Sequence, residues 1–394
     1  MAGLSLCMIP TLFWCSLGLV LYAYFGYPSV LMAIAAIRNR RVRRRPNNCA
    51  VTFIITAYNE AARIAAKIEN TLAQNYQGPL EIIVASDYSS DGTDDIVRAF
   101  APRVRLVRAA ERRGKEAAQQ LAVQVATGEI LVFSDVATAL APDAVATITE
   151  NFADPTVGCV SSIDRFVDAD GRVSGEGAYV RYEMFLRALE TRVNTLVGLS
   201  GSFFAARRTV CRDWASDRQS DFNTLLNSVR LGLRGVLDPL SVGYYRPISD
   251  PRCEFQRKVR TVVRGIGVFA ASVPMLNPLR YGLFAWQLAS HKLCRWLAPW
   301  AMIGAFVTNA WLATESFWWV AIFGAQLGFY AAIAGGGAGN RSLRIPYYFF
   351  VANLAILIAW LRYARGDRMV SWNPSERPAS LPQVSCAFDL RISR

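Results

Sequence analysis

Long uncharged segments lie near both ends of the chain, with a segment of mixed character between them. No charged side chain occurs from Met1 to Ile37, and three further stretches are also uncharged: Trp296 to Thr314, Ser316 to Asn340 and Ile345 to Leu361. About 20 apolar residues in a helix cross the hydrocarbon core of a membrane. The pattern therefore predicts one membrane span near the start and three near the end, because helices packed in a soluble core would keep a polar face.

Between these ends, short β-branched apolar runs alternate with helix-forming segments. The predicted strands are Val51–Thr56, Leu80–Ala85, Val104–Val107 and Ile130–Phe133, and the helices between them are Ala61–Ala73, Thr93–Phe100 and Gly114–Ala126. Strands and helices alternating at this spacing predict a mostly parallel, Rossmann-like sheet covered on both faces, which is an α/β domain.

Polar residues stand where three of the predicted strands end. Thr56, Asp87 and Asp135 each come directly after an apolar run. In parallel sheets, ligands bind beyond the carboxyl ends of the strands. We therefore expect these three side chains to meet at one edge of the sheet and to form part of a binding site.

Two basic, amphipathic segments follow the α/β region, Gln256–Gly265 and Leu279–His291. Each is too short and too charged to span a membrane, so both are expected to lie at its surface. The predicted organisation is a membrane anchor with a basic segment (1–45), an α/β domain (46–250), interfacial helices (251–295), transmembrane helices (296–363) and a tail (364–394).

The distribution of charge predicts how the chain is oriented in the membrane. The net charge is +13, and six arginines directly follow the first span. They are Arg38, Arg40, Arg41, Arg43, Arg44 and Arg45. The positive-inside rule then puts the α/β domain in the cytosol, and contact with anionic lipid explains the cluster better than nucleic acid does. Further arginines after the last span leave the orientation of the tail open.

Cysteine usage excludes two classes of site. The eight cysteines form no CxxC pair, and His291 is the only histidine. Neither a zinc site nor a disulfide framework is expected, in agreement with a reducing compartment.

Four short motifs carry candidate chemistry. The motifs are Thr56-Ala57-Tyr58-Asn59-Glu60, Ser86-Asp87-Tyr88-Ser89-Ser90-Asp91-Gly92-Thr93, Arg112-Arg113-Gly114-Lys115 and Phe133-Ser134-Asp135-Val136-Ala137-Thr138. The third is a basic turn that opens a helix, an arrangement that favours phosphate. Each motif alone is compatible with ordinary turn chemistry, whereas their order and spacing together are specific.

In this order the motifs resemble the inverting family 2 glycosyltransferases, which have a GT-A fold. The resemblance implies a nucleotide-sugar donor, with UDP as the expected nucleotide. The implied donor-binding residues are Thr56, Tyr58, Glu60, Asp87, Lys115, Ser134 and Asp135. Asp135 matches the first residue of the DxD-type motif and would hold Mg²⁺ or Mn²⁺ with the diphosphate. Ala137 stands where that motif ends in a carboxylate or amide, so weak metal binding is expected.

The similarity extends to membrane-bound members such as cellulose, chitin and hyaluronan synthases. Those enzymes carry a later catalytic aspartate and then a Q(Q/R)xxRW motif. Asp221, just before the predicted helix Phe222–Arg230, matches the aspartate, and Gln256, Arg257 and Arg260 match the second motif. The resemblance implies that Asp221 is the catalytic base and that the other three contact the acceptor or the pyrophosphate. A helix N-cap is the alternative for Asp221.

These features predict an inverting glycosyltransferase of the bacterial inner membrane that takes part in cell-surface polysaccharide synthesis, by single or processive transfer. Its expected partners are the nucleotide-sugar, a saccharide or lipid-linked acceptor and membrane lipids, together with a second copy of the chain or other polysaccharide-export components. A non-catalytic membrane partner that keeps the fold is one alternative, which Ala137 favours. A transporter is the other, although the predicted spans lack the charges expected of one.

Overall fold

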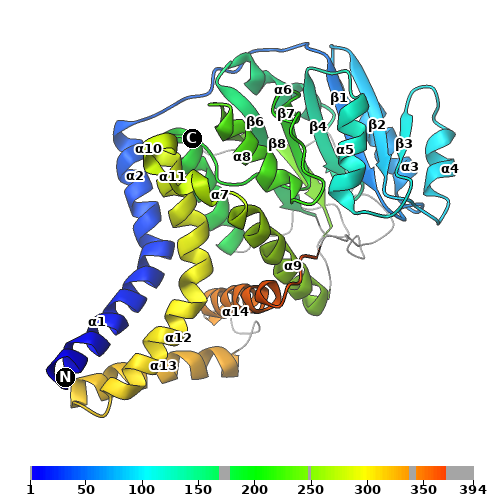
Figure 1. The fold of residues 1–394 in the computed structure, drawn as a ribbon. Helices are drawn as coiled ribbons and strands as arrows, with labels where there is room; N and C mark the ends of the chain where they lie inside the picture. Colours follow the sequence, from blue (N-terminus) through cyan, green and yellow to red (C-terminus); the bar gives the residue numbers. More distant parts are fainter. Residues whose placement is uncertain (1, 168–177, 247–249, 337–342, 370–394) are drawn as a thin grey trace. The chain divides into compact units, whose positions relative to one another are not determined.

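The computed structural model describes residues 2–167, 178–246, 250–336 and 343–369 (Figure 1). The chain divides into two compact units. Of the described residues, the helical unit comprises 2–39, 178–193, 255–336 and 343–368, and the sheet unit comprises 40–167, 194–246, 250–254 and Met369. This division differs from the predicted boundaries: residues 178–193, expected within the α/β domain, belong to the helical unit, whereas residues 40–45 and 251–254 belong to the sheet unit.

The sheet unit is built on an eight-stranded sheet with the order β3-β2-β1-β4-β7-β6-β8-β5 (Figure 1). The strands are β1 Val51–Ala57, β2 Leu80–Ser86, β3 Arg105–Arg108, β4 Ile130–Asp135, β5 Ala139–Leu140, β6 Val157–Phe166, β7 Phe203–Arg207 and β8 Arg234–Tyr245. Strands β1 to β4 pair in parallel, as do β6 and β8. Strand β7 is antiparallel to both of its neighbours, and β5 is antiparallel to β8. The predicted mostly parallel sheet is confirmed, with two antiparallel members that the pattern did not reveal.

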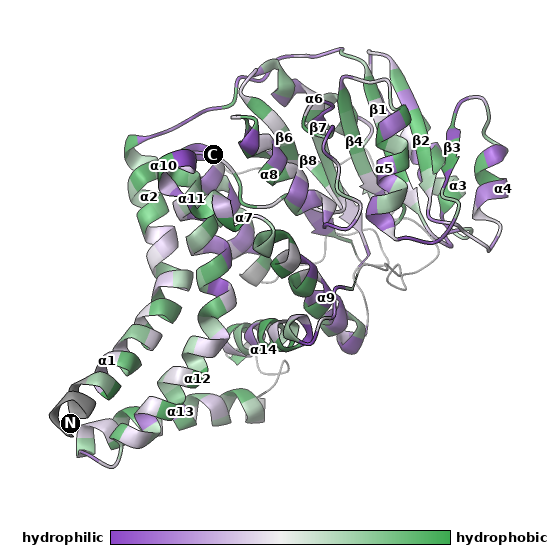
Figure 2. Ribbon diagram, viewed as in Figure 1, coloured by the Kyte–Doolittle hydropathy of each residue, from purple (hydrophilic) through white to green (hydrophobic). Residues whose placement is uncertain are grey.

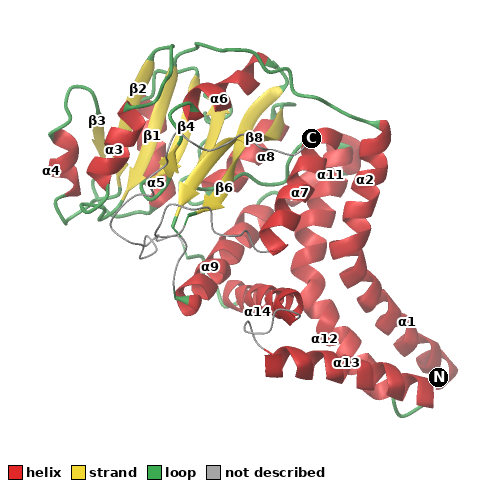
Figure 3. Cartoon of the chain, turned by 180° about the vertical axis from the view of Figure 1, so that it is seen from behind, coloured by secondary structure: helices red, strands yellow, loops and turns green. Residues whose placement is uncertain are grey.

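Helices cover both faces of this sheet, which explains its nearly continuous apolar strands. Figure 3 shows the sheet unit from behind, with helices on either side of the strands. The helices are α3 Ile64–Leu72, α4 Thr93–Arg98, α5 Lys115–Val125, α6 Ala144–Glu150 and α8 Ser220–Arg230, with a 3₁₀ turn at Asn151–Ala153. Each predicted helix is present: α3, α4 and α5 are shorter by one to three residues at their ends, and α8 begins two residues earlier than predicted.

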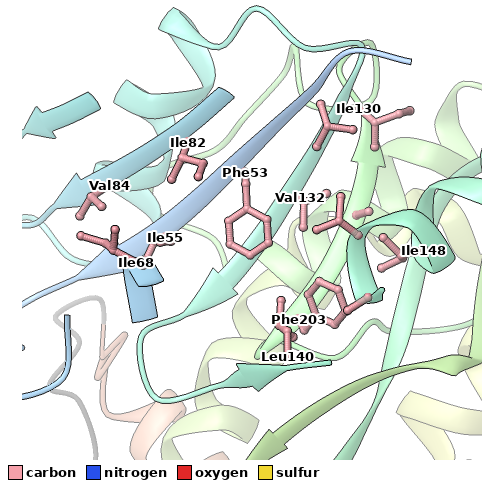
Figure 4. Packing of buried hydrophobic residues seen from close by; sticks show 14 of the residues in the cluster. Phe53, Ile55, Ile68, Ile82, Val84, Ile130, Val132, Leu140, Ile148 and Phe203 are labelled. Atoms are coloured by element: carbon pink, nitrogen blue, oxygen red, sulfur yellow. The ribbon is translucent and has the colours of Figure 1, made fainter. Parts of the chain in front are cut away.

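Side chains of successive strand residues point into two separate cores, since a strand alternates its faces. Phe53 and Ile55 of β1 join a cluster with Ile68 of α3 and Ile148 of α6, labelled in Figure 4. Ile54, between them, joins the opposite cluster. In that second core, the Phe133 ring stacks on those of Phe204 and Trp214, with ring centroids 4.7 and 4.9 Å apart.

The side chain of Arg44, in the basic cluster, is bound within the sheet unit rather than free for lipid. Arg44 pairs with Glu150 at 2.9 Å and with the buried Asp238 at 3.0 Å. The side chains of Asn151 and Ser241 also donate hydrogen bonds to Asp238. This network fastens the segment that precedes β1 to helix α6 and strand β8.

The helical unit contains long apolar helices, coloured largely green in Figure 2. Its elements are α1 Ala2–Leu21, a π turn Tyr22–Gly26, α2 Tyr27–Ile37, α7 Ala178–Val193, α9 Pro251–Ala270, 3₁₀ turn Val273–Leu276, α10 Pro278–Tyr281, α11 Leu283–Leu288, a π turn Ala289–Cys294, α12 Arg295–Leu312, α13 Phe317–Gly336 and α14 Arg344–Ala364. Helix α9 enters this unit at Phe255.

Among the described residues, three helical stretches are long and apolar enough to cross a membrane: Met8–Ile37, Phe317–Gly335 and Ile345–Ala364. The fourth predicted span lies in α12 and is not among them. Its polar residues Thr308 and Asn309, together with its tryptophans, lower the mean hydropathy. Gln256–Gly265 and Leu279–His291 are largely helical, and their place at the membrane surface stays a prediction.

Helix α7 is held in the helical unit by buried charged groups. The Tyr27 hydroxyl donates to Glu190 at 2.7 Å, and His291 Nδ1 lies 2.5 Å from the same carboxylate. Two turns earlier on α7, Glu183 pairs with Arg295. Buried charges need such partners, because a charge left alone in a low-dielectric interior is costly. This network explains why a helix that follows β6 in sequence belongs to the helical unit.

Candidate functional site

The register of the sheet brings the predicted strand-end residues to one edge. Thr56 of β1 pairs directly with Asp135 of β4, and the Asp87 backbone N–H donates to Ala57 O at 2.9 Å. The carboxyl ends of β1, β2 and β4 therefore form a common rim, as the sequence predicted.

Two of these residues support the rim from inside. Asp87 is fully buried and accepts hydrogen bonds from the backbone N–H groups of Arg113 (2.9 Å) and Gly114 (2.9 and 3.0 Å). It thereby fixes the basic turn that opens α5. Thr56 is also fully buried, and its hydroxyl accepts from Gln119 at 3.1 Å. Direct contact of Thr56 and Asp87 with a donor stays a prediction.

Lys115 connects Asp135 at the rim to the turn that contains Gly201. Its Nζ donates to the carboxylate of Asp135 and to Gly201 O, the latter at 3.0 Å. Gly201 in turn lies against the predicted base: a Cβ built on it would be 2.8 Å from Asp221 Oδ2. The structure thus brings Lys115, Asp135 and Asp221 together around Gly201, although they are far apart in sequence.

Asp221 lies in the first turn of α8 and is not its N-cap. The capping position is Gln219, which makes no side-chain capping bond. The Asp221 carboxylate instead accepts from the Gln219 side chain at 3.1 Å and from the Phe222 N–H at 2.7 Å. The N-cap alternative is therefore wrong, and the carboxylate faces Gly201.

Sequence reasoning missed the residues that hold the Gly201 turn. Ser200 donates to Asp164 Oδ2 at 2.6 Å, and Ser202 donates to Asp164 Oδ1. The Asp135 N–H donates to Ser202 O at 3.0 Å. A motif search could not find Asp164, because only the pairing of β6 with β7 brings it to this turn.

The first motif places an ion pair and an aromatic ring beside the rim. Glu60 is buried and pairs with Arg63 at 2.6 Å. Burial raises the pKa of Glu60, Arg63 opposes this shift, and the charge of Asp135 adds to it. The Arg112 guanidinium lies 3.9 Å from the centroid of the Tyr58 ring, a cation–π contact. Tyr58 is partly exposed and Arg112 exposed, so both can reach a ligand.

A second lysine, also missed, lies beneath the β4–β5 turn. Lys67 of α3 is fully buried, and its Nζ donates to Ser134 Oγ at 2.8 Å and Thr138 O at 2.6 Å. Burial lowers its pKa to about 7, and the charge of Asp135 opposes that shift. Ser134, predicted to bind the donor, therefore uses its hydroxyl to accept from Lys67.

Few side chains at the rim could act as ligands of a metal ion. Asp135 is partly exposed, while Ala137 offers no ligand oxygen. Within the described parts of the chain, no group of three or more His, Cys, Asp or Glu side chains is arranged to hold a metal ion. A Mg²⁺ or Mn²⁺ ion fits here only with Asp135 as its protein ligand and with water and phosphate oxygens as the others.

The predicted acceptor residues lie on α9. Gln256, Arg257 and Arg260 belong to the helical unit, so their place relative to the rim stays a prediction. Burial lowers the pKa of Arg260, and the like charges of Arg264 and Arg257 add to the shift. Three arginines at helical spacing concentrate positive charge on this helix.

Comparison with known families identifies the sheet unit. The family described as "Glycosyl transferase family 2" matches residues 52–214. These residues therefore form a glycosyl transferase family 2 domain, as the motifs implied. The parallel half of the sheet, the rim, Lys115 and Asp135 all lie within the matched range, whereas Asp221 and α9 lie beyond it.

Two curated relatives match part of the chain. The chain is 34% identical over 125 residues to the succinoglycan biosynthesis protein ExoO of Rhizobium meliloti, which covers 31% of this chain and 35% of the relative. It is 28% identical over 195 residues to poly-beta-1,6-N-acetyl-D-glucosamine synthase of Staphylococcus aureus, covering 47% and 46%. The chain thus matches less than half the length of these two relatives.

One solved structure resembles nearly the whole chain. The mannosyltransferase PcManGT from Pyrobaculum calidifontis, in complex with GDP-Man and Mn²⁺, aligns with a TM-score of 0.68 and 25% identity. The alignment covers 90% of this chain and 99% of that one. The similarity therefore includes helical segments as well as the sheet unit.

Proposed function

We propose that this protein transfers a sugar from a nucleoside-diphosphate sugar to a saccharide or lipid-linked acceptor, with inversion, in the synthesis of a cell-surface polysaccharide. One observation carries the proposal: Lys115 bridges Asp135 to Gly201, against which Asp221 packs. A cation for the leaving diphosphate and a carboxylate for the acceptor thus stand on either side of one turn.

Each group has a task in a direct displacement at the anomeric carbon. Asp221 takes the proton of the attacking acceptor hydroxyl. Lys115 and the N-terminus of α5 stabilise the negative charge that develops on the diphosphate. Tyr58 and Arg112 flank the nucleoside. On α9, Arg257 and Arg260 attract the anionic part of the acceptor or the pyrophosphate.

A divalent ion held by Asp135 would supply further charge stabilisation to the diphosphate. The similar mannosyltransferase was solved with GDP-Man and Mn²⁺, which supports both a nucleoside diphosphate and a metal. UDP remains our first choice of nucleotide from the motifs, and GDP is the alternative that this neighbour supports.

The proposal is tested on purified, detergent-solubilised protein. Incubation with UDP- and GDP-sugars and Mn²⁺ or Mg²⁺ should release nucleotide for one donor class. In calorimetry, Mn²⁺ should lower the Kd of that nucleoside diphosphate. In Asp135→Ala, the effect of Mn²⁺ on this Kd should be smaller by a factor of at least about ten. Binding without turnover on any acceptor would instead support the non-catalytic partner, and an equal Mn²⁺ effect in Asp135→Ala would contradict the placement of the metal.

Restoring the missing ligand should strengthen metal use. Ala137→Asp adds a carboxylate two residues after Asp135, where complete motifs carry one. We expect the Mn²⁺ concentration for half-maximal nucleotide binding to fall about tenfold. Ala137→Ser, which adds a polar group without charge, is the control. An unchanged Mn²⁺ requirement in Ala137→Asp would mean that position 137 does not face the ion.

A further inference from the structure

Lys67 is a fully buried lysine whose hydrogen-bond partners are neutral. It extends from α3 to the turn between β4 and β5, where it donates to Ser134 Oγ and Thr138 O. Its ammonium also lies 5.4 Å from the centroid of the Phe53 ring. No carboxylate of the described residues lies within ion-pairing distance of Lys67.

A buried lysine with only neutral hydrogen-bond partners is an unusual residue for holding a turn. Burying a charge without an opposite partner is costly, whereas a neutral donor would satisfy Ser134 and Thr138 at less cost. The nearby acid, Asp135, acts on Lys67 through space and is itself paired with Lys115. Lys67 and Lys115 therefore both act on one carboxylate here.

Lys67 lies under the turn in which Ala137 offers no oxygen to a metal ion. Ser134 and Thr138, which Lys67 holds, bracket both Asp135 and Ala137. We infer that Lys67 is a positioning residue that fixes this turn and supplies positive charge to the donor diphosphate from beneath, in partial replacement of the cation charge that Ala137 cannot help to bind. The inference rests on the proposed function, because it needs a diphosphate at the rim.

Two features of the site support this role. Electrostatic attraction is strong in a low-dielectric interior, so a buried ammonium acts on a nearby phosphate without contact. The geometry is also fixed before any ligand arrives, because two hydrogen bonds on opposite sides of the turn hold the ammonium in place. A purely structural lysine would act on all ligands alike, whereas the charge of Lys67 acts most on the ligand with more phosphate charge.

The experiment compares a nucleoside diphosphate with its monophosphate. Full-length protein in detergent is titrated with UDP and UMP, and with GDP and GMP, in EDTA. The variants are Lys67→Met, which removes charge and donor, and Lys67→Gln, which keeps a donor without the charge. Asn70→Ala is the matched control, because Asn70 lies on the same helix and holds Leu140 of β5 by two neutral hydrogen bonds. Thermal unfolding is recorded for each protein.

We expect both Lys67 variants to bind the diphosphate about tenfold more weakly and the monophosphate less than about twofold more weakly. Asn70→Ala should leave the ratio of the two affinities unchanged. An unchanged ratio in both Lys67 variants, or loss of the cooperative unfolding transition in both, would assign Lys67 to structure alone. If the wild type binds no nucleoside diphosphate, the proposed function fails together with this inference; if it binds and only the ratio is unaffected, the inference alone fails.

Discussion

Asp221→Asn should lower the rate of sugar transfer about 10²–10⁴-fold and leave donor binding unchanged, because the amide cannot take the acceptor proton. Asn keeps the size of the side chain, and its carbonyl oxygen can still accept from the Phe222 N–H, as Asp221 Oδ1 does. Its NH2 group takes the place of Oδ2, and the contact with Gln219 is kept when the Gln219 amide turns so that its oxygen accepts. Folding and insertion into detergent or membrane should therefore be as in the wild type. Turnover is measured as product formed at saturating donor, and donor affinity by calorimetry.

Asp217→Asn is the matched control, since Asp217 is exposed and precedes the same helix. It should transfer sugar at the wild-type rate. Normal turnover in Asp221→Asn would remove Asp221 from the role of base, and a variant that loses both donor binding and its unfolding transition would show that the carboxylate is needed for structure.

Gly201→Ala should lower turnover by about tenfold or more, because the added methyl group displaces the base. The new Cβ would be 2.8 Å from Asp221 Oδ2, closer than side-chain carbons approach oxygen, so the carboxylate must move. A shift of about 1 Å in a catalytic group is enough to cost up to about 100-fold in rate. Donor affinity should change little, since the Gly201 carbonyl that accepts from Lys115 is kept.

A double-mutant cycle separates this cause from a general disturbance of the turn. If Gly201→Ala acts by displacing the base, it should have no further effect on turnover in the Asp221→Asn background. Independent, additive losses would mean that the methyl group harms the site by another route, such as the contacts that Ser200 and Ser202 make with Asp164.

The sequence predicted the parallel half of the sheet and its rim with little error. Strands β1, β2 and β4 are continuous apolar runs because helices cover both of their faces, and each run ends at a polar residue. Local patterns contain this information, since the alternation of strands and helices and the position of the next turn depend on neighbouring residues. The glycosyltransferase family also followed from motif order.

Only the tertiary structure decided which side chains meet at the site. Asp164, Gly201 and Asp221 lie on three separate elements, and the antiparallel pairing of β7 between β4 and β6 brings them together. Lys67 gave no motif signal, since a lysine in an amphipathic helix is usually exposed. The ion pairs of Glu183 and Glu190 likewise assign α7 to the helical unit. Local sequence determined the elements, whereas long-range pairing and burial determined the chemistry, because both depend on residues far apart in the chain.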